Sequence, residues 1–261
     1  MTVANTAIAT ATDPLRRLLS PRHVAVFGGR AAAEVVRQCQ QLGFVGEIWP
    51  VHPRHEFMEG LRCYPDVAAL PAAPDASFIA VPRQGTIELV AELSARGAGG
   101  VICYASGFAE VGGEGVALQQ HLVAAAAGMA LLGPNCYGML NYLDGVALWP
   151  DQNGGQRLAR GVAIVTQSGN IGLNLTMQTR GLPLACLITV GNKAGASIEN
   201  KISGCEPKLF KANGQHGLFH STISAQFVLI GGHGQDFAIL LNGLLGALAP
   251  RPTFDNSIAT I

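Results

Sequence analysis

Two short segments of the chain could bind phosphate through their backbone. Gly28-Gly29 follow an apolar run at residues 23–27 and precede a stretch with helical periodicity. Ser168-Gly169-Asn170 stand in the same position before a second helical stretch. Free backbone N–H groups at a helix N-terminus attract anions without any net positive charge on the protein. The alternatives are a plain glycine turn at the first segment and a serine N-cap at the second.

The residues after the first two expected strands distinguish between classes of nucleotide. The segment FGGRAAAEVV lacks the GxGxxG spacing of dinucleotide-binding folds, and no Asp or Glu ends the second expected strand to bind a ribose hydroxyl. Pro53 and Arg54 follow that strand instead. A basic residue at this place favours a ribose that carries a phosphate. Two ligands therefore stay open, NADP and coenzyme A (CoA) with its 3′-phosphate.

The sequence shows no Ser/His/Asp set, carboxylate pair or metal cluster after the expected strands. His52 and His55 have HxxH spacing, but they lie in an expected loop without a third ligand, so no metal is expected. Separate cysteines without a CxxC pair are typical of reduced thiols in a cytoplasmic protein, and we expect them to pack in the core. These cysteines are Cys39, Cys63, Cys103, Cys136, Cys186 and Cys205.

The elements that must position these residues follow a regular pattern. From residue 23 onward, short apolar runs alternate with helical stretches, which is typical of βα units on a parallel sheet. Gly43 and Gly97 stand where helix C-termini favour glycine, and Asp66 is expected to cap a short helix before Pro71. The expected strands are 23–27, 47–51, 76–81, 100–104 and 130–132, and the expected helices are 31–42, 86–96 and 114–127. This pattern predicts an α/β fold with a Rossmann-like, doubly wound parallel sheet.

The alternation pauses after about residue 141 and then starts again. A strand at 161–166, a helix at 171–180 and a strand at 184–190 predict the start of a second α/β domain. After residue 200 the pattern is lost. The expected organisation is a flexible tail, a first domain, a linker, the start of a second domain and an unrecognised tail, at residues 1–14, 15–145, 146–160, 161–200 and 201–261.

The charge composition excludes several classes of partner. Basic and acidic residues number 17 each, so the net charge is zero, and charged residues make up only 13% of the chain. This balance provides no electrostatic surface for nucleic acid or anionic lipid. The longest apolar runs, such as 122–132, are too short to span a membrane, and the first residues lack the features of a secretory signal. Whether the chain forms oligomers stays open.

Seven stretches taken together resemble one protein family. They are SPRHVAVFGG, GFVGEIWPVHPRHE, CYPDVAALPAAPDASFIAVP, GVICYASGFAEVGGEG, LLGPNCYGMLNY, RGVAIVTQSGNIGLNLTMQ and ITVGNKAG. Over about residues 15–197 the sequence resembles the CoA-binding region of the NDP-forming acyl-CoA synthetases of the ADP-forming acetate–CoA ligase type, which are related to the succinyl-CoA synthetase α subunit. The SGFAE and GPNCYG motifs are the specific ones.

This resemblance implies a CoA-binding Rossmann-like domain followed by the start of a succinyl-CoA synthetase-like flavodoxin domain. It implies that Gly28, Gly29 and Arg30 contact the CoA phosphates and that Pro53-Arg54 lie near the nucleotide end. The other residues implied for the CoA cleft are Val81, Pro82, Ser106, Gly107, Phe108, Pro134, Asn135 and Cys136. Ser168-Gly169-Asn170 match the loop that receives the phosphate of a phosphohistidine. The implied reaction converts ATP, a carboxylic acid and CoA to ADP, phosphate and acyl-CoA through an acyl phosphate.

The sequence departs from the family after residue 200. The family's phosphorylatable histidine follows the GNKAG segment, and the candidates here are His216, His220 and His233, of which His233 in GGHG is a weak match. Residues 201–261 do not resemble the family, and their sequence is expected to be aberrant. The chain has no ATP-grasp region, so ATP, ADP and Mg²⁺ are expected to bind only through a missing ATP-grasp part or partner subunit.

Three functions follow from these observations. The first is the CoA-binding portion of an ADP-forming acid–CoA ligase that needs further parts for catalysis. The second is a non-catalytic module that binds CoA or acyl-CoA and regulates a partner. The third is an NADP-dependent oxidoreductase, which is less favoured because the sequence lacks GxGxxG and a convincing proton donor.

Overall fold

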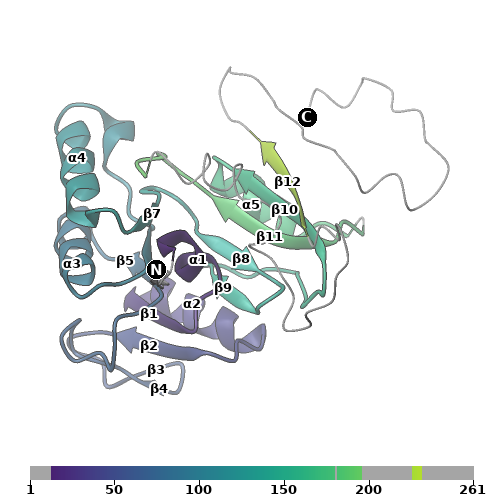
Figure 1. Ribbon diagram of the computed structural model, residues 1–261, viewed down its shortest axis with the longest axis horizontal. Coiled ribbons are helices and arrows are strands. Elements are labelled where there is room, and N and C mark those ends of the chain that lie inside the picture. The colour runs from purple at the N-terminus through teal and green to yellow at the C-terminus, as the bar shows by residue number, and fades with distance from the viewer. Residues whose placement is uncertain (1–12, 180, 196–224, 231–261) are drawn as a thin grey trace, which may run out of the picture.

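A computed structural model of the protein describes residues 13–179, 181–195 and 225–230 (Figure 1). The strands of this part form a five-stranded parallel sheet, a five-stranded mixed sheet and a small hairpin. In Figure 1, helices α3 and α4 lie on the side of the first sheet that faces away from the mixed sheet. The predicted α/β class is confirmed.

The first sheet contains the five strands that the sequence predicts. They are β1 (His23–Gly28), β2 (Glu47–Val51), β5 (Ala76–Ala80), β6 (Gly100–Cys103) and β7 (Ala130–Leu132), in the order β2-β1-β5-β6-β7. All the pairings are parallel. From β1 the chain moves outward to β2 and then returns to the other side of β1 to form β5. The winding direction therefore reverses between β1 and β5, and in doubly wound sheets this switch point forms a crevice at the carboxyl ends of the strands.

Helices cover both faces of the first sheet, which explains why its strands are almost entirely apolar. Val24 and Val26 point to the face that carries α1 (Pro14–Leu19) and α2 (Arg30–Gln41). Ala25 and Phe27 point to the opposite face, where they pack with residues of α3 (Arg83–Ala95) and α4 (Glu114–Ala126). Gly43 and Gly97 follow α2 and α3 with φ of 70° and 80°, as their places in the sequence predict.

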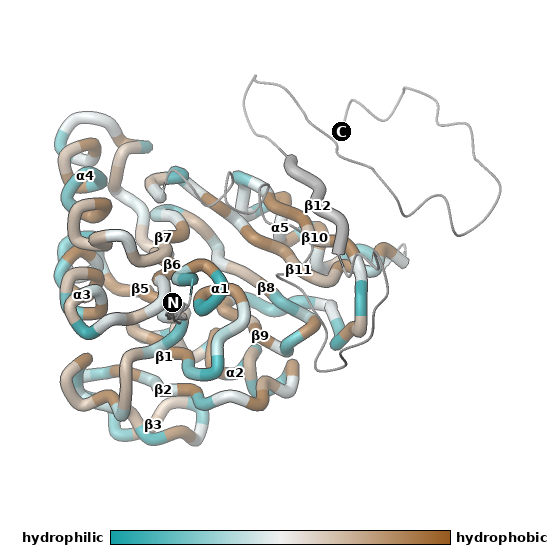
Figure 2. Tube along the Cα trace, in the orientation of Figure 1, coloured by the Kyte–Doolittle hydropathy of each residue, from teal (hydrophilic) through white to brown (hydrophobic). Residues whose placement is uncertain are grey.

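The second sheet mixes parallel and antiparallel pairings. It contains β8 (Met139–Asn141), β9 (Val146–Leu148), β10 (Gly161–Thr166), β11 (Leu184–Thr189) and β12 (Ala225–Ile230), in the order β12-β10-β11-β8-β9. Strand β10 pairs in parallel with β11 and β12, whereas β8 is antiparallel to both β11 and β9. Apolar residues run along β10 and β11 (Figure 2). Helix α5 (Gly169–Thr176) follows β10.

One hydrophobic cluster connects the two sheets. It includes Val24 of β1 and Val36 of α2 together with Leu148 of β9 and Ile164 of β10. Helix α2 contacts both the first sheet and β9. The two sheets therefore share buried apolar surface, and the loops at their adjoining ends are held at fixed positions relative to each other.

Short elements account for the differences from the predicted pattern. Residues 146–148, which we expected in a linker, form the buried strand β9. The expected loop after β2 contains the hairpin strands β3 (Phe57–Met58) and β4 (Leu61–Arg62). The expected short helix after Asp66 is a turn in which the Asp66 carboxylate accepts a hydrogen bond from the Ala69 N–H at 2.9 Å. Strands of two or three residues are too short to show a period, so tertiary pairing decides them.

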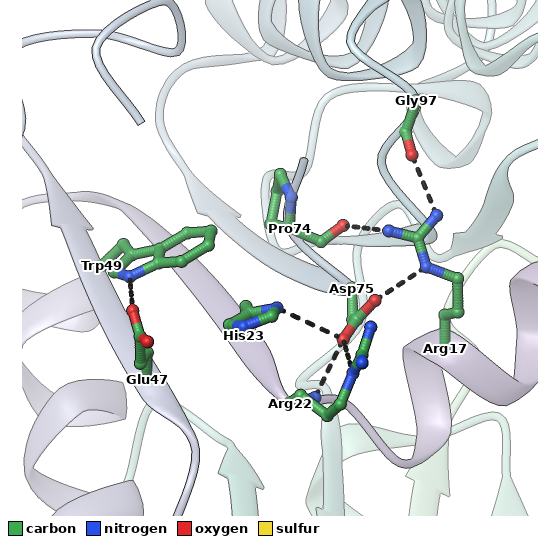
Figure 3. Close-up of polar contacts among 8 residues, drawn as sticks. All are labelled: Arg17, Arg22, His23, Glu47, Trp49, Pro74, Asp75 and Gly97. Atoms are coloured by element: carbon green, nitrogen blue, oxygen red, sulfur yellow. Dashed lines mark hydrogen bonds and ion pairs between the residues drawn. The ribbon is translucent and has the colours of Figure 1, made fainter. Parts of the chain in front are cut away.

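An ionic cluster ties the amino-terminal ends of the strands to α1 (Figure 3). The Asp75 carboxylate, whose side chain is 4% exposed, accepts from Arg17 Nε at 2.7 Å, from the Arg22 backbone N–H at 3.0 Å and from Arg22 Nε at 3.4 Å. His23 Nδ1 lies 3.6 Å from the same carboxylate. Burial raises the pKa of Asp75, but these hydrogen bonds and the two arginine charges outweigh burial, so the pKa lies below its ordinary value.

Candidate functional site

A pocket of about 520 Å³ lies at the carboxyl ends of β1, β2 and β5, where the winding direction reverses. We call it the switch-point pocket. It brings together six of the predicted ligand-binding residues from three separate loops, namely Gly28, Gly29, Pro53, Arg54, Val81 and Pro82. Its other lining residues include Phe27, Val51, His52, Asp66, Leu89, Glu88 and Glu92. Cavities of this size are typical of small-molecule sites.

The two glycines after β1 serve different purposes. Gly28 has φ of +130°, and a Cβ atom there would lie 2.4 Å from the Ala80 carbonyl oxygen, so only glycine lets β1 and β5 pair this closely. A Cβ atom at Gly29 would have no atom within 4 Å. Gly29 is the N-cap of α2 and has no side chain to bind the first N–H groups of the helix. The space above these groups is open to a ligand.

Arg54 is the basic residue of the switch-point pocket. Its side chain is exposed, and its guanidinium has no hydrogen-bonding or ionic partner in the part of the chain that the structure describes. Arg30, at the start of α2, is exposed in the same way but does not line the pocket. Glu88 and Glu92 line the pocket from α3, so its electrostatic potential is mixed. An anionic ligand is therefore expected to place its charge near Gly29 and Arg54 rather than near α3.

A second pocket, of about 480 Å³, lies between the first sheet and the second. We call it the inter-sheet pocket. It is lined by Tyr104, Ala105, Ser106, Asn135, Cys136, Tyr137, Gln167, Ser168, Gly169 and Asn170. The structure thus brings the predicted loop Ser168-Gly169-Asn170 next to three residues predicted for the CoA cleft, although the two groups are far apart in the sequence.

The Ser168 loop has the geometry of a capped helix N-terminus. The Ser168 hydroxyl accepts a hydrogen bond from the Ile171 N–H at 3.4 Å, so the serine N-cap is present. A Cβ atom at Gly169 would lie 2.5 Å from Tyr137 Cδ2, which explains why a glycine stands there. Tyr137 donates to the Asp151 carboxylate at 3.3 Å. Burial and the nearby Asp151 charge raise the pKa of the Tyr137 phenol, so it stays protonated at neutral pH.

A hydrogen-bond network links the SGFAE and GNKAG motifs across the two sheets. The Glu110 carboxylate accepts from the backbone N–H groups of Gly107 and Phe108, at 2.5 and 3.2 Å, and from the Asn192 side chain. Asn192 also donates to Gln119 Oε1 at 3.1 Å. Partial burial raises the pKa of Glu110, but these hydrogen bonds lower it by more than burial raises it. The pKa therefore lies below its ordinary value, and the carboxyl is ionised at neutral pH. Both motifs are visible in the sequence, but the contact between Glu110 and Asn192 is not, because the two residues lie 82 positions apart.

Several residues predicted for the CoA cleft line neither pocket. Phe108 is fully buried in the hydrophobic core beside α4. Pro134 is also buried, and its carbonyl accepts from the Asn192 N–H at 2.9 Å. Gly107 has φ of +94°, and its carbonyl accepts from Arg83 at 3.0 Å. These residues shape the loops, and direct contact of each with a ligand stays a prediction.

The cysteine thiols of the described residues are not arranged for nucleophilic chemistry. Burial raises the pKa of Cys136 to about 12, and its thiol donates to the Cys103 carbonyl at 3.6 Å. Burial likewise raises the pKa values of Cys39 and Cys186 to about 12. Cys39, Cys63, Cys103, Cys136 and Cys186 are all free. Because the thiolate is the reactive form, Cys136 contributes packing rather than a nucleophile.

Some predicted residues lie outside the described residues, namely Cys205, His216, His220 and the candidate catalytic histidine His233. Within the described ranges, no group of three or more His, Cys, Asp and Glu side chains could hold a metal ion. Helices long and apolar enough to cross a membrane are likewise absent from this part of the chain.

Comparison with known proteins identifies the domain that contains the switch-point pocket. Residues 22–142 match the family model for a CoA-binding domain. An ADP-forming acetate–CoA ligase II from Archaeoglobus fulgidus is 30% identical over 194 residues, which cover 69% of this chain and 28% of the relative. The α subunit of the corresponding Pyrococcus furiosus ligase II is 29% identical over 187 residues, covering 67% of this chain and 39% of the relative. The chain contains a CoA-binding domain of the ADP-forming acyl-CoA synthetase family.

Three further proteins are similar to this chain over much of its length. A trans-feruloyl-CoA synthase from an unknown prokaryotic organism is 37% identical over 198 residues, 71% of this chain and 28% of the relative. The apo structure of an acetyl-coenzyme A synthetase from Ca. Korarchaeum cryptofilum has a TM-score of 0.62 and 30% identity, covering 69% of this chain and 40% of that one. A crystal structure from Pyrococcus horikoshii OT3 has a TM-score of 0.67 and 26% identity, covering 74% and 46%. The chain spans less than half the length of each of these proteins.

Proposed function

We propose that the switch-point pocket binds coenzyme A and that the chain is the CoA-binding portion of an ADP-forming acid–CoA ligase. The observation that carries the proposal is the convergence of Gly29, Arg54 and Pro82, from three adjacent strand ends, in one pocket of the matched domain. Ligands of doubly wound sheets bind at this switch point. The pocket's volume of about 520 Å³ suits part of a large nucleotide cofactor.

Local groups can hold the CoA phosphates although the chain has no net charge. The open space above Gly29 lets a pyrophosphate approach the free N–H groups of α2, as glycine at a helix N-terminus does in other nucleotide sites. Arg54 has no carboxylate partner among the described residues, so its guanidinium is available to the 3′-phosphate. In this arrangement the α2 N-terminus binds the pyrophosphate and Arg54 binds the 3′-phosphate, so Arg54 is the residue that distinguishes CoA from dephospho-CoA.

The inter-sheet pocket is proposed as the place where the CoA-binding domain meets the phosphoryl chemistry of the ligase. Ser168-Gly169-Asn170 present a helix N-terminus toward a pocket shared with Ser106 and Asn135. Such an N-terminus can stabilise a phosphate transferred to and from a histidine. ATP, ADP and Mg²⁺ would bind to an ATP-grasp part that lies elsewhere or on a partner subunit. His233 stays the weak candidate for the phosphorylated histidine, and a cytoplasmic location stays part of the proposal.

Calorimetry with CoA and dephospho-CoA tests the proposed ligand. We expect wild-type protein to bind CoA more tightly than dephospho-CoA, and Arg54→Ala to remove most of this difference. Arg96→Ala is a matched control, because Arg96 bonds the carbonyls of Ala68 and Leu70 and lines neither pocket. If neither ligand binds to the wild type, the proposed function is wrong. Binding of NADPH in place of CoA would favour the oxidoreductase.

A non-catalytic module that senses CoA or acyl-CoA is the second candidate function. The observation that favours it concerns two side chains of the inter-sheet pocket: Cys136 is a buried thiol with a pKa of about 12, and Tyr137 has a raised pKa, so neither is ionised for nucleophilic attack at neutral pH. Incubation with radiolabelled ATP and an ATP-grasp subunit distinguishes the two functions. Stable label on a histidine of this chain would exclude the sensor, whereas CoA-dependent association without label would support it.

A further inference from the structure

We infer that His52 is a positioning residue whose ring nitrogen Nδ1 holds the turn that presents Arg54 to the switch-point pocket, so that ligand affinity depends on a neutral imidazole. This inference rests on the proposed function, because it names the group that orients the arginine of that site. His52 itself lines the pocket, immediately after β2.

The turn is built on two hydrogen bonds to one side-chain atom. His52 Nδ1 accepts from the backbone N–H of Arg54 at 3.1 Å and from the backbone N–H of His55 at 3.0 Å. Asp and Asn side chains form the same pattern when they bind N–H groups two and three residues further along a turn. A nitrogen that accepts two hydrogen bonds carries no proton, so the ring proton lies on Nε2.

Residues outside the turn and the neighbouring His55 ring contact His52, whereas the Arg54 side chain has no hydrogen-bonding or ionic partner among the described residues. The His52 N–H donates to the Tyr64 carbonyl at 2.9 Å, which ties the start of the turn to the segment after β4. The ring of His55 packs edge-on against His52, with 4.0 Å between the ring centroids. Within the described part of the chain, no other side chain hydrogen-bonds to residues 53–55. Among the described residues, the imidazole is therefore the only side chain that hydrogen-bonds to the turn that carries Arg54.

Protonation would reverse the role of Nδ1. An imidazolium Nδ1 is a donor that faces two N–H donors, so the turn would open. The groups that face His52 are Arg54 and His55 in its own loop, and Asp66, Glu88 and Glu92 across the pocket. Partial burial and then the charges of His55 and Arg54 lower the pKa of His52, which keeps the ring neutral at neutral pH.

The direction of the pH effect separates positioning from simple charge. If His52 only contributed charge, protonation would strengthen the binding of a phosphate ligand. If His52 positions Arg54, protonation weakens binding and weakens it more for CoA than for dephospho-CoA. The ligand's own phosphates also titrate in this range, so a variant without a titratable residue at this position is needed as the reference.

The experiment compares His52→Ala and His52→Asn with wild type by calorimetry at neutral and mildly acid pH. Asparagine can accept the same N–H groups through Oδ1 but does not titrate. We expect His52→Ala to weaken CoA binding about tenfold at neutral pH, a change of about 1.4 kcal/mol. We expect His52→Asn to stay within about twofold of wild type and to lose less affinity than wild type on acidification. His121→Asn, on the exposed face of α4, is the matched histidine control.

A double-mutant cycle with Arg54 completes the test. If His52 acts through Arg54, His52→Ala in an Arg54→Ala background should cost little further affinity. Additive losses, unchanged CoA affinity in His52→Ala, or equal pH profiles for wild type and His52→Asn would each overturn the inference. Wild-type protein that binds neither CoA nor dephospho-CoA would instead overturn the proposed function. If His52→Ala does not fold, the pH profile of His52→Asn against wild type still decides the question.

Discussion

The two ends of the first sheet place arginines in opposite surroundings. At the amino-terminal ends of the strands, Arg17 and Arg22 both bind the Asp75 carboxylate, and Arg17 also donates to the carbonyls of Pro74 and Gly97. At the carboxyl-terminal ends, Arg83 pairs with Glu114, whereas Arg30 and Arg54 are exposed and have no ionic partner among the described residues. The charges of Arg17 and Arg22 are therefore satisfied within the protein, and those of Arg30 and Arg54 are available to a ligand.

This difference shows how one fold separates stability from binding. A buried carboxylate that is fully hydrogen-bonded holds α1, β1 and β5 together and has little capacity left for a ligand. An unpaired arginine beside a glycine turn contributes little to stability but can pair with a phosphate. The same residue type therefore has a structural role at one end of the sheet and a proposed ligand-binding role at the other.

The largest effect on stability is expected at Gly28, which lies at the carboxyl-terminal end of β1 and packs closely against the backbone of β5. Gly28→Ala should lower the free energy of unfolding by about 3 kcal/mol, because the new Cβ would lie 2.4 Å from the Ala80 carbonyl oxygen and φ is +130°. Gly29→Ala meets no atom and should cost much less stability while weakening CoA binding. Urea denaturation and calorimetry of both variants measure this. Equal stability losses would contradict the division between the two glycines.

The next effect is expected from removing Asp75. Asp75→Ala should lower the free energy of unfolding by about 2 kcal/mol, because the partly buried Arg17 Nε and the Arg22 N–H lose their acceptor. The CoA affinity of the folded variant should stay close to that of wild type. Denaturation followed by circular dichroism gives the stability. A folded variant with normal stability but weak CoA binding would show that the two ends of the sheet are not separate.

A pair of arginine variants tests the separation directly. Arg54→Ala should weaken CoA binding about tenfold and change the free energy of unfolding by less than about 0.5 kcal/mol. Arg17→Ala should have the opposite result, with a stability loss of about 1 kcal/mol and unchanged binding. Both quantities need to be measured on both variants. A shared loss of stability and affinity in either variant would contradict the comparison.

The smallest effect is expected from acid. The pKa of Asp75 lies below its ordinary value of 3.8, so the folded state prefers the carboxylate. The stability that Asp75 provides is therefore complete above this ordinary value and is lost as the pH falls through the lower, folded pKa. Asp75→Asn should be less stable than wild type at neutral pH, and the gap should narrow below pH 3.8. A gap that is independent of pH would show that the Asp75 charge contributes nothing.

Much of the fold could be predicted from periodicity. The strand at residues 23–27 and the glycines after α2 and α3 were predicted because apolar runs and positive-φ positions are local properties. Strand β9 and the hairpin after β2 were missed because their two- and three-residue strands show no period. Strand β12 lies in a segment without recognisable pattern, and its pairing with β10 is visible only in three dimensions.

The candidate site could likewise be predicted from the sequence only in part. The sequence by itself determined which residues follow each strand, because that depends only on where apolar runs end. Only the tertiary structure decided that Gly29 and Arg54 share one pocket and that Ser168 shares another with Asn135, because strand order and sheet packing set these neighbours. It also decided that His52 holds its own turn, since a hydrogen bond to Nδ1 depends on the rotamer of the ring and not on sequence spacing.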